Sequence, residues 1–285
     1  MTNLRVQKNN STISKTESKN IALSIQFSLD GFSFCVVNSL KNSCTYFKEY
    51  QFKETQNSPE SLLEEIKDIF NSDTNLQLEY DKVTVIHENN LATLVPNQFF
   101  NEDSLANYLS LNIKTFKSDF ITFDEIDIID AKNVFIPYVN INNYLFQNFG
   151  EFEYKHHNTI LLEKLLKINT SDKKVMYVNV SKNTFDLIVL DNNKLILSNS
   201  FSYISKEDFI YYILFTAEQL ELDTMDFQLY FMGNITKLDA IYKTTYKYIK
   251  NVFFLESNNS IFKELEIANH SNYILLGTWE LYQEN

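Results

Sequence analysis

The sequence predicts an α/β fold in which one strand-rich unit occurs twice. Residues 21–37 and residues 174–190 each alternate apolar and polar side chains around a turn, which is the pattern of a β-hairpin. Overlaying residue 25 on residue 178 makes positions of the same kind coincide, so that Ile25, Phe27, Ser28, Phe32, Phe34 and Val36 fall on Val178, Val180, Ser181, Phe185, Leu187 and Val189. The order strand, strand, strand, helix, strand, helix follows in both halves, which indicates a duplication.

In the first half, the hairpin turns at Asp30-Gly31, and a third strand is expected over residues 45–52. Ser58-Pro59-Glu60 combines an N-cap residue, a proline in the first turn and an early acid, so a helix is predicted to begin there. Residues 82–87 read KVTVIH, a short buried strand, and a further helix is expected from residue 101 or 103 through residue 113.

In the second half, a third strand over residues 194–202 follows a turn at Asp191-Asn192-Asn193. Ser205 is followed three residues later by Asp208, which is close to a capping box and predicts the start of a helix. A strand over residues 228–232 ends at Gly233-Asn234, and a last helix is expected to run through Ile249.

The length and composition suit two packed domains. The chain has 285 residues, of which 44% are hydrophobic, enough for a core in each half. We expect a polar disordered tail over residues 1–20, a first domain over 21–167 and a second domain over 168–285. No apolar run approaches the ~18 residues needed to span a bilayer, and the first twenty residues lack the apolar stretch of a signal peptide. Two cysteines are too few for a disulfide framework, so the expected compartment is the cytoplasm.

The charge of the chain argues against two kinds of partner. The formal net charge is −12, and the lysines are scattered along the sequence. Binding to nucleic acid or to an anionic membrane surface depends on a cluster of basic residues, and the sequence contains none. We therefore expect neither a nucleic-acid partner nor membrane insertion.

Aromatic residues are abundant and glycines are scarce. The chain has 24 Phe, 17 Tyr and four Gly, whereas usual abundance would give roughly twenty glycines. The hairpin residues Phe32 and Phe34 and the third-strand residues Tyr46, Phe47, Tyr50 and Phe52 either fill a core between helices or form an exposed interface patch. A chain with so few glycines cannot build several glycine-rich nucleotide loops.

These features together resemble a known superfamily. The repeated hairpins, the segment NVFIPYVNINNYLFQNFGEFEYKHHNTILLEKLL (residues 133–166) and YFMGNI (residues 230–235) resemble the actin-like ATPases, especially the PilM-like branch of type IV pilus assembly. The sequence resembles still more closely the domain-of-unknown-function family 3822. This resemblance, over residues 21–276, implies a duplicated actin-like (ribonuclease H-like) fold in which two βββαβα-type domains face a cleft.

The resemblance also locates the nucleotide loops. In ATP-using members each hairpin opens with Asp-x-Gly, where the Asp orients Mg²⁺ through water and the Gly lets backbone N–H groups approach the phosphates. In this chain the Asp positions hold Gln26 and Asn179, and the Gly positions hold Ser28 and Ser181. Because an amide has no charge with which to hold Mg²⁺, both loops depart from the pattern in the same way.

Five other residues complete the set of candidate positions. Asp30 and Gly31 lie in the turn of the first hairpin, and Thr184 occupies a hydroxyl position of the second loop. The superfamily's third loop, an adenosine contact, usually carries paired glycines after a strand, whereas this chain has Gly233 followed by Asn234. With Gln26, Ser28, Asn179 and Ser181, these residues are the candidate positions of a degenerate nucleotide cleft.

Other residues give weaker indications of chemistry. His156 and His157 are adjacent and are expected on opposite faces of a strand, where they make a poor metal chelate at or near the surface. Cys35 is expected to be a small buried apolar residue. The stretch DEIDIID (residues 124–130) reads as an exposed strand face rather than a Ca²⁺ loop. Walker A, Rossmann and Gly-x-Ser-x-Gly motifs are absent from the sequence.

The sequence therefore favours a non-catalytic actin-like-fold module that binds or assembles, without catalytic residues, metal or cofactor, and with a protein partner or a second copy as its ligand. The alternative is an ATP-binding or ATP-hydrolysing member with altered phosphate loops, whose cofactor would be Mg-ATP. A small-molecule kinase would need an acid as base, but Asp186 is expected in a strand face and Asp191 in a turn.

Overall fold

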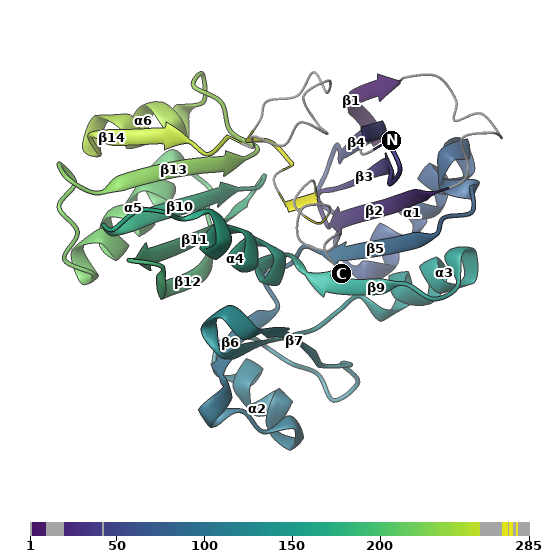
Figure 1. Cartoon of the computed structure of the whole chain (residues 1–285), viewed down its shortest axis with the longest axis horizontal. Helices are drawn as coiled ribbons and strands as arrows, with labels where there is room; N and C mark the ends of the chain where they lie inside the picture. Colours follow the sequence, from purple (N-terminus) through teal and green to yellow (C-terminus); the bar gives the residue numbers. More distant parts are fainter. Residues whose placement is uncertain are drawn as a thin grey trace. The chain divides into compact units, whose positions relative to one another are not determined.

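The computed structural model describes residues 2–9, 20–41, 43–256, 270–272, 274–275 and 278. The chain forms two compact units, which Figure 1 colours along the sequence. The first contains Met1–Leu161 together with Ile274, Leu275 and Thr278, and the second contains Leu162–Asn258 with the residues around His270. This division differs from the expected domains 21–167 and 168–285, because it falls between Leu161 and Leu162 and because Ile274, Leu275 and Thr278 belong to the first unit.

The first unit is built on a six-stranded mixed sheet. Its strands, in the order β1-β4-β3-β2-β5-β9, are Thr2–Asn9 (β1), Ser43–Phe52 (β4), Gly31–Asn38 (β3), Ile21–Ser28 (β2), Lys82–His87 (β5) and Glu153–His156 (β9). The pairs β1–β4, β4–β3 and β3–β2 are antiparallel, whereas the pairs β2–β5 and β5–β9 are parallel. The three strands predicted over 21–52 are confirmed. The expected disordered tail differs from the structure at residues 2–9, where β1 pairs along β4.

The turn of the first hairpin is held by its third strand. The Phe52 N–H donates to the Asp30 carbonyl at 2.9 Å, which ties the end of β4 to the β2–β3 turn. A Cβ atom on Gly31 would lie 2.7 Å from the Tyr50 carbonyl oxygen, closer than real Cβ contacts. Gly31 is therefore required by the close approach of β4, a role inside the sheet.

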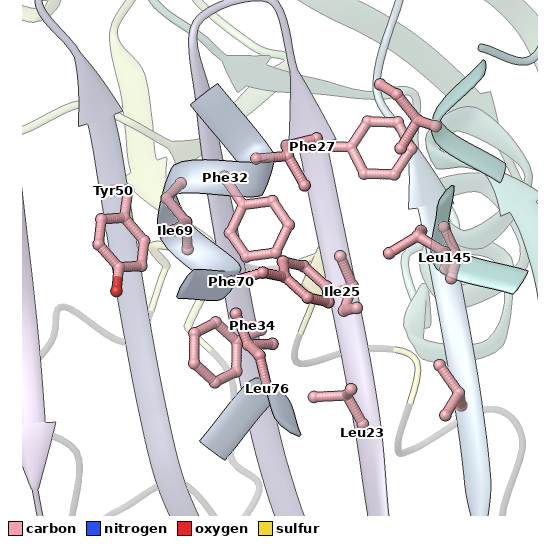
Figure 2. Close-up of a cluster of buried hydrophobic side chains, with 14 of the residues drawn as sticks. Leu23, Ile25, Phe27, Phe32, Phe34, Tyr50, Ile69, Phe70, Leu76 and Leu145 are labelled. Atoms are coloured by element: carbon pink, nitrogen blue, oxygen red, sulfur yellow. The ribbon is translucent and has the colours of Figure 1, made fainter. Parts of the chain in front are cut away.

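Two helices cover one face of this sheet. Helix α1 (Pro59–Ser72) begins at the predicted residue, where Ser58 and Ser61 form a capping box, and it leads into the short 3₁₀ helix η1 (Thr74–Gln77). Helix α3 (Val139–Phe149) lies beside α1. Figure 2 shows the cluster that they enclose with the sheet, which includes Phe27, Phe32, Phe34, Tyr50, Ile69, Phe70 and Leu145.

The aromatic residues of the hairpin and third strand belong to the core. Phe32, Phe34, Tyr46, Phe47, Tyr50 and Phe52 are all buried. Of the two alternatives that the sequence left open for them, the exposed interface patch is therefore wrong. Residues at alternate positions of each strand point to the same side of the sheet, so Phe32, Phe34, Tyr46, Tyr50 and Phe52 lie on the face that the helices cover.

The other face of the same sheet is contacted by Thr278. Ser24, Ser33, Cys35 and Thr84 are buried on that face, and Ile274, Leu275 and Thr278 are buried residues of the same unit. The Ser24 and Thr278 hydroxyl oxygens lie 2.9 Å apart in a buried hydrogen bond. Cys35 is a free, fully buried cysteine, as predicted.

A small insertion between β5 and α3 forms a third sheet. Its strands are Ala92–Pro96 (β6), Ala131–Phe135 (β8) and Thr122–Ile126 (β7), in the order β6-β8-β7. The helical segments are η2 (Asn97–Phe99), η3 (Glu102–Ser104), α2 (Leu105–Ser110) and η4 (Asp127–Ile129). The helix predicted from residue 101 or 103 through 113 is thus only six residues of α-helix. The acidic stretch 124–130 is strand only as far as Ile126, and Asp130 turns the chain with φ 51°.

The second unit repeats the core of the first. Its five strands, in the order β12-β11-β10-β13-β14, are Lys194–Ser202 (β12), Thr184–Asp191 (β11), Val175–Val180 (β10), Gln228–Gly233 (β13) and Asn251–Phe254 (β14). β12, β11 and β10 are antiparallel, and β13 and β14 run parallel to β10. Helices α5 (Lys206–Gln219) and α6 (Ala240–Tyr248) pack on one face, and α5 begins with the predicted Ser205–Asp208 capping box. Helix α4 (His157–Ile168) precedes β10.

The equivalence of the two units extends to fine details of the backbone. The β3–β4 ladder has its bulge between Val36 and Val37, and the β11–β12 ladder has its bulge between Val189 and Leu190, the overlaid positions. The Tyr203 N–H donates to the Asn183 carbonyl at 3.0 Å, as the Phe52 N–H does to Asp30 in the first unit. The predicted duplication is therefore present in the structure, with β4 equivalent to β12.

Candidate functional site

The first hairpin loop carries Gln26, Ser28, Asp30 and Gly31. The Gln26 amide nitrogen donates to a Glu88 carboxylate oxygen at 2.7 Å, and the Gln26 amide oxygen is buried without a hydrogen-bond partner. The Ser28 hydroxyl accepts the Asp30 N–H at 3.2 Å. The Asp30 carboxylate accepts a hydrogen bond from the Thr55 hydroxyl. At the position where an ATP-using loop has a carboxylate for Mg²⁺, this loop therefore has an amide bound to the chain's own acid.

The second loop repeats this arrangement. Asn179 and Asp186 lie directly opposite each other on β10 and β11, and the Asn179 amide nitrogen donates to Asp186 at 3.0 Å. The Ser200 hydroxyl donates to the other Asp186 oxygen at 2.6 Å. The Ser181 N–H donates to the Thr184 carbonyl at 2.9 Å, which closes the turn. Asp186 lies on a strand, as expected, and is buried beside Asn179.

The third loop lies beside the second because β10 and β13 are parallel neighbours, with Val180 opposite Gly233. The Gly233 N–H donates to the His270 carbonyl at 2.8 Å, and the Asn234 N–H donates to the Val180 carbonyl at 2.6 Å. The His270 ring lies 4.3 Å from the Phe254 ring and bonds the Ile235 carbonyl through Nε2 at 2.6 Å. His270 of the same chain therefore packs against this loop and accepts its Gly233 N–H.

Gly233 is fixed by its neighbours. Its φ is +85°, and an added Cβ atom would lie 2.4 Å from the Val180 carbonyl oxygen and 2.8 Å from the Asn179 side-chain oxygen. No side chain fits there, because the obstructing Val180 atom is backbone. The glycine is thus explained by strand packing and a left-handed turn.

These loops do not fit a Mg·nucleotide. A turn-built phosphate site needs backbone N–H groups that are free to bind an anion. The N–H groups of Asp30, Ser181, Gly233 and Asn234 are instead bonded within the chain. Both magnesium positions hold amides, and across the described residues no group of three or more His, Cys, Asp or Glu is placed to hold a metal ion.

Two buried histidines, one at the end of β5 and one at the end of β9, have structural roles. His87 accepts the Tyr138 N–H on Nδ1 at 3.2 Å, so Nε2 carries the proton and donates to Asn142 at 2.9 Å. His87 thereby supplies the cap that helix α3 lacks at Tyr138. Burial lowers the pKa of His87 to about 4, although the bond to Asn142 opposes the shift.

His156 is likewise part of a buried network. Its Nδ1 accepts the Asn158 N–H at 3.2 Å, and Nε2 donates to the Asn89 carbonyl at 3.0 Å. The Asp124 carboxylate accepts from the His156 N–H at 2.8 Å and from the Thr159 hydroxyl at 2.7 Å. Burial lowers the pKa of His156, and so does the neighbouring His157. The expected surface location is therefore wrong: the two histidines are buried at the β9–α4 junction with their ring centroids 4.4 Å apart.

Comparison with known proteins identifies the fold. A family described as Protein of unknown function (DUF3822) matches residues 10–252. A Bacteroides thetaiotaomicron protein with an actin-like ATPase fold and unknown function superimposes with a TM-score of 0.79, at 23% identity, over 95% of this chain and 99% of that one. The PilM–PilN type IV pilus biogenesis complex matches with a TM-score of 0.54, at 13% identity, over 90% of this chain and 96% of that one. No curated protein matches the sequence.

The fold is therefore the α/β actin-like ATPase fold, with two mixed sheets, as the resemblance implied. At these identities the likeness establishes the fold alone. Among the described residues, the helices are all too short or too polar to cross a bilayer.

Proposed function

The chain belongs to the DUF3822 family, and we propose that it is a non-catalytic binding or assembly module whose nucleotide loops are degenerate. Its ligand is a protein, either a partner or a second copy, because the charge of −12 disfavours nucleic acid. Because fold alone does not give function, the proposal depends on the loops.

One observation carries this proposal: all three loops are closed by the chain's own hydrogen bonds. Gln26 is bonded to Glu88, Asn179 to Asp186, and the Gly233 N–H to the His270 carbonyl. To bind a phosphate, the third loop would have to break the partly buried backbone hydrogen bond between Gly233 and His270, which costs up to about 1–3 kcal/mol if its groups are left unpaired. The matching PilM structure is a complex with PilN, so the same fold serves protein binding in that case.

The alternative is an ATP-binding or ATP-hydrolysing protein with altered phosphate loops. It is favoured by a specific observation, since a carboxylate lies beside each substituted position, Glu88 next to Gln26 and Asp186 next to Asn179. A rearrangement that freed either carboxylate would restore an oxygen ligand for Mg²⁺.

Thermal melting with and without Mg·ATP, together with phosphate release, separates the two functions. A ligand present at a hundred times its Kd stabilises the folded state by about 2.7 kcal/mol, a shift of several degrees for a protein of this size. The proposal predicts no shift and no phosphate release. A Mg²⁺-dependent shift that is lost in Asn234→Trp, a variant at an exposed position of the third loop, would support the alternative instead.

A further inference from the structure

The outer edge of β12 is unpaired within the part of the chain that the structure describes, whereas the equivalent edge of β4 pairs with β1. β1 pairs antiparallel along residues 46–52 of β4, and the overlay of the two units places residues 46–51 on residues 197–202 of β12. β12 is the end strand of its sheet, and among the described residues no strand lies beyond it, as Figure 1 shows. No residue of β12 is buried, whereas β4 buries four.

The backbone of β12 presents donors and acceptors at this edge. The Tyr203 N–H bonds inward to Asn183, so residues of the other parity, Ser198, Ser200 and Ser202, direct their N–H and C=O groups outward. The Ser200 N–H is bonded to the neighbouring Asn199 side chain at 2.9 Å, a local contact that satisfies one outward donor. The outward groups have the spacing that an added antiparallel strand requires.

This edge also lacks the features that usually prevent strand pairing. β9 is four residues long with Glu153 and Lys155, and β14 also has four residues. β12 has nine residues, no proline, and its only charge is Lys194 at the first position. Natural proteins block open edges with charges, prolines or short strands, so a long uncharged edge indicates a surface that is normally covered.

We propose that β12 pairs with β12 of a second copy of this chain, antiparallel about a twofold axis at Asn199. In that register Leu197 lies opposite Phe201, and Ser198 lies opposite Ser200, on both sides of the axis. A second copy fits because this register is self-complementary: the apolar Leu197 meets Phe201, Ser198 meets Ser200, and residues 195–202 bring no charge to the interface of a chain whose net charge is −12. The paired sheets would form one continuous ten-stranded sheet from two copies of the five-stranded one.

This inference rests on the proposed function, that the chain acts by binding, and it names a second copy as the partner. Its test is sedimentation equilibrium of the full chain, without nucleotide, so failure here leaves the Mg·ATP result unaffected. At roughly 100 μM the wild-type chain is expected to be a dimer. Asn199→Lys and Asn199→Glu should each raise the dimer dissociation constant by about tenfold or more, because like charges then lie opposite each other. An equimolar mixture of the two variants restores the dimer.

The design has internal controls. Asn199 is exposed, and the equivalent position in the first unit is Lys48, so a lysine is compatible with this strand. Lys and Glu change the net charge in opposite directions, so a general charge effect would strengthen one dimer while weakening the other. Ser198→Pro, which removes an outward N–H, dissociates the dimer, whereas Ser198→Ala does not. A monomeric wild type, dimers unaffected by either charge, or a mixture that stays monomeric would each overturn the proposal.

Discussion

The sequence around Gly233 suggests a ligand site, but the structure shows that a glycine is required there by the packing of the backbone. A glycine after a buried strand matched the third nucleotide loop of the actin-like superfamily. The structure gives it a positive φ and places it against the Val180 carbonyl, and its N–H is bonded to His270. Both constraints are local to the second unit and involve no ligand.

Substitution of two glycines by alanine tests this explanation. Gly233 and Gly150 both have positive φ, but a Cβ atom on Gly150 would meet nothing within 4 Å. Gly150→Ala is expected to cost about 1–2 kcal/mol from backbone strain. Gly233→Ala is expected to cost at least about 2 kcal/mol more, because a backbone clash is added. Urea denaturation measures both values, and equal losses would contradict the proposed role of Val180.

His87 makes the stability of the first unit dependent on pH. Its pKa is about 4 in the folded protein, below the usual value of about 6.5 expected after unfolding. The neutral ring is favoured by folding, so its contribution is complete above pH 6.5 and is lost as the pH falls towards 4. His87→Gln, which can still accept and donate, should reduce by about 2 kcal/mol the stability lost between pH 7.5 and pH 5. Chemical denaturation at the two pH values decides this, and an unchanged loss would contradict it.

At the scale of elements, strand β4 is joined to the end of α1 by one buried carboxylate. Tyr46, Lys48 and Tyr50 occupy alternate positions of β4 and all donate to one oxygen of Asp73, at 3.0, 2.8 and 3.2 Å. The other oxygen accepts from the N–H and side chain of Asn75 in η1, both at 3.1 Å. Burial alone would raise the pKa of Asp73, but the bonds from Lys48 and Asn75 outweigh it and lower the pKa.

Removing this carboxylate should be costly. Asp73→Ala leaves Lys48 and two tyrosine hydroxyls unpaired in a mostly buried site, so we expect a loss of about 3–5 kcal/mol in the free energy of unfolding. The matched control is Glu64→Ala, which breaks an exposed pair with Lys67 and is expected to cost less than about 0.5 kcal/mol. Urea denaturation of both variants measures the difference. A cost for Asp73→Ala below that of a single neutral hydrogen bond, about 1 kcal/mol, would show that Asp73 does not hold β4 to the end of α1.

The sequence predicted the elements whose pattern of apolar and polar residues is visible within one short segment. The hairpins were predictable because alternation along β2, β3, β10 and β11 is visible in the sequence. Of the sheet of β6, β7 and β8, only the strand at residues 124–126 was predicted, because its strands have five residues each. In the acidic stretch Asp124 was expected to be exposed, but it is buried and accepts hydrogen bonds from His156 and Thr159. These partners lie about thirty residues further along the chain, so the local sequence does not indicate them. Such long-range contacts leave no mark on a local pattern.

At the scale of the whole molecule, duplication predicted two units but not where the chain ends. Ile274, Leu275 and Thr278 belong to the first unit, where the Thr278 hydroxyl contacts Ser24 of the sheet. Of the candidate site, the sequence supplied the positions of the amides and serines. It did not supply the carboxylates that hold them, since Glu88 and Asp186 are brought to Gln26 and Asn179 only by strand pairing.

Calorimetric titration of Mg·ATP into the full chain tests most directly our proposal that this protein does not use Mg·ATP. We predict only heats of dilution up to about 1 mM nucleotide, because the N–H groups of Asp30, Ser181, Gly233 and Asn234 are bonded internally and the amides give Mg²⁺ no charge. A saturable one-to-one isotherm with a Kd below roughly 100 μM, lost when Mg²⁺ is chelated, would contradict the claim.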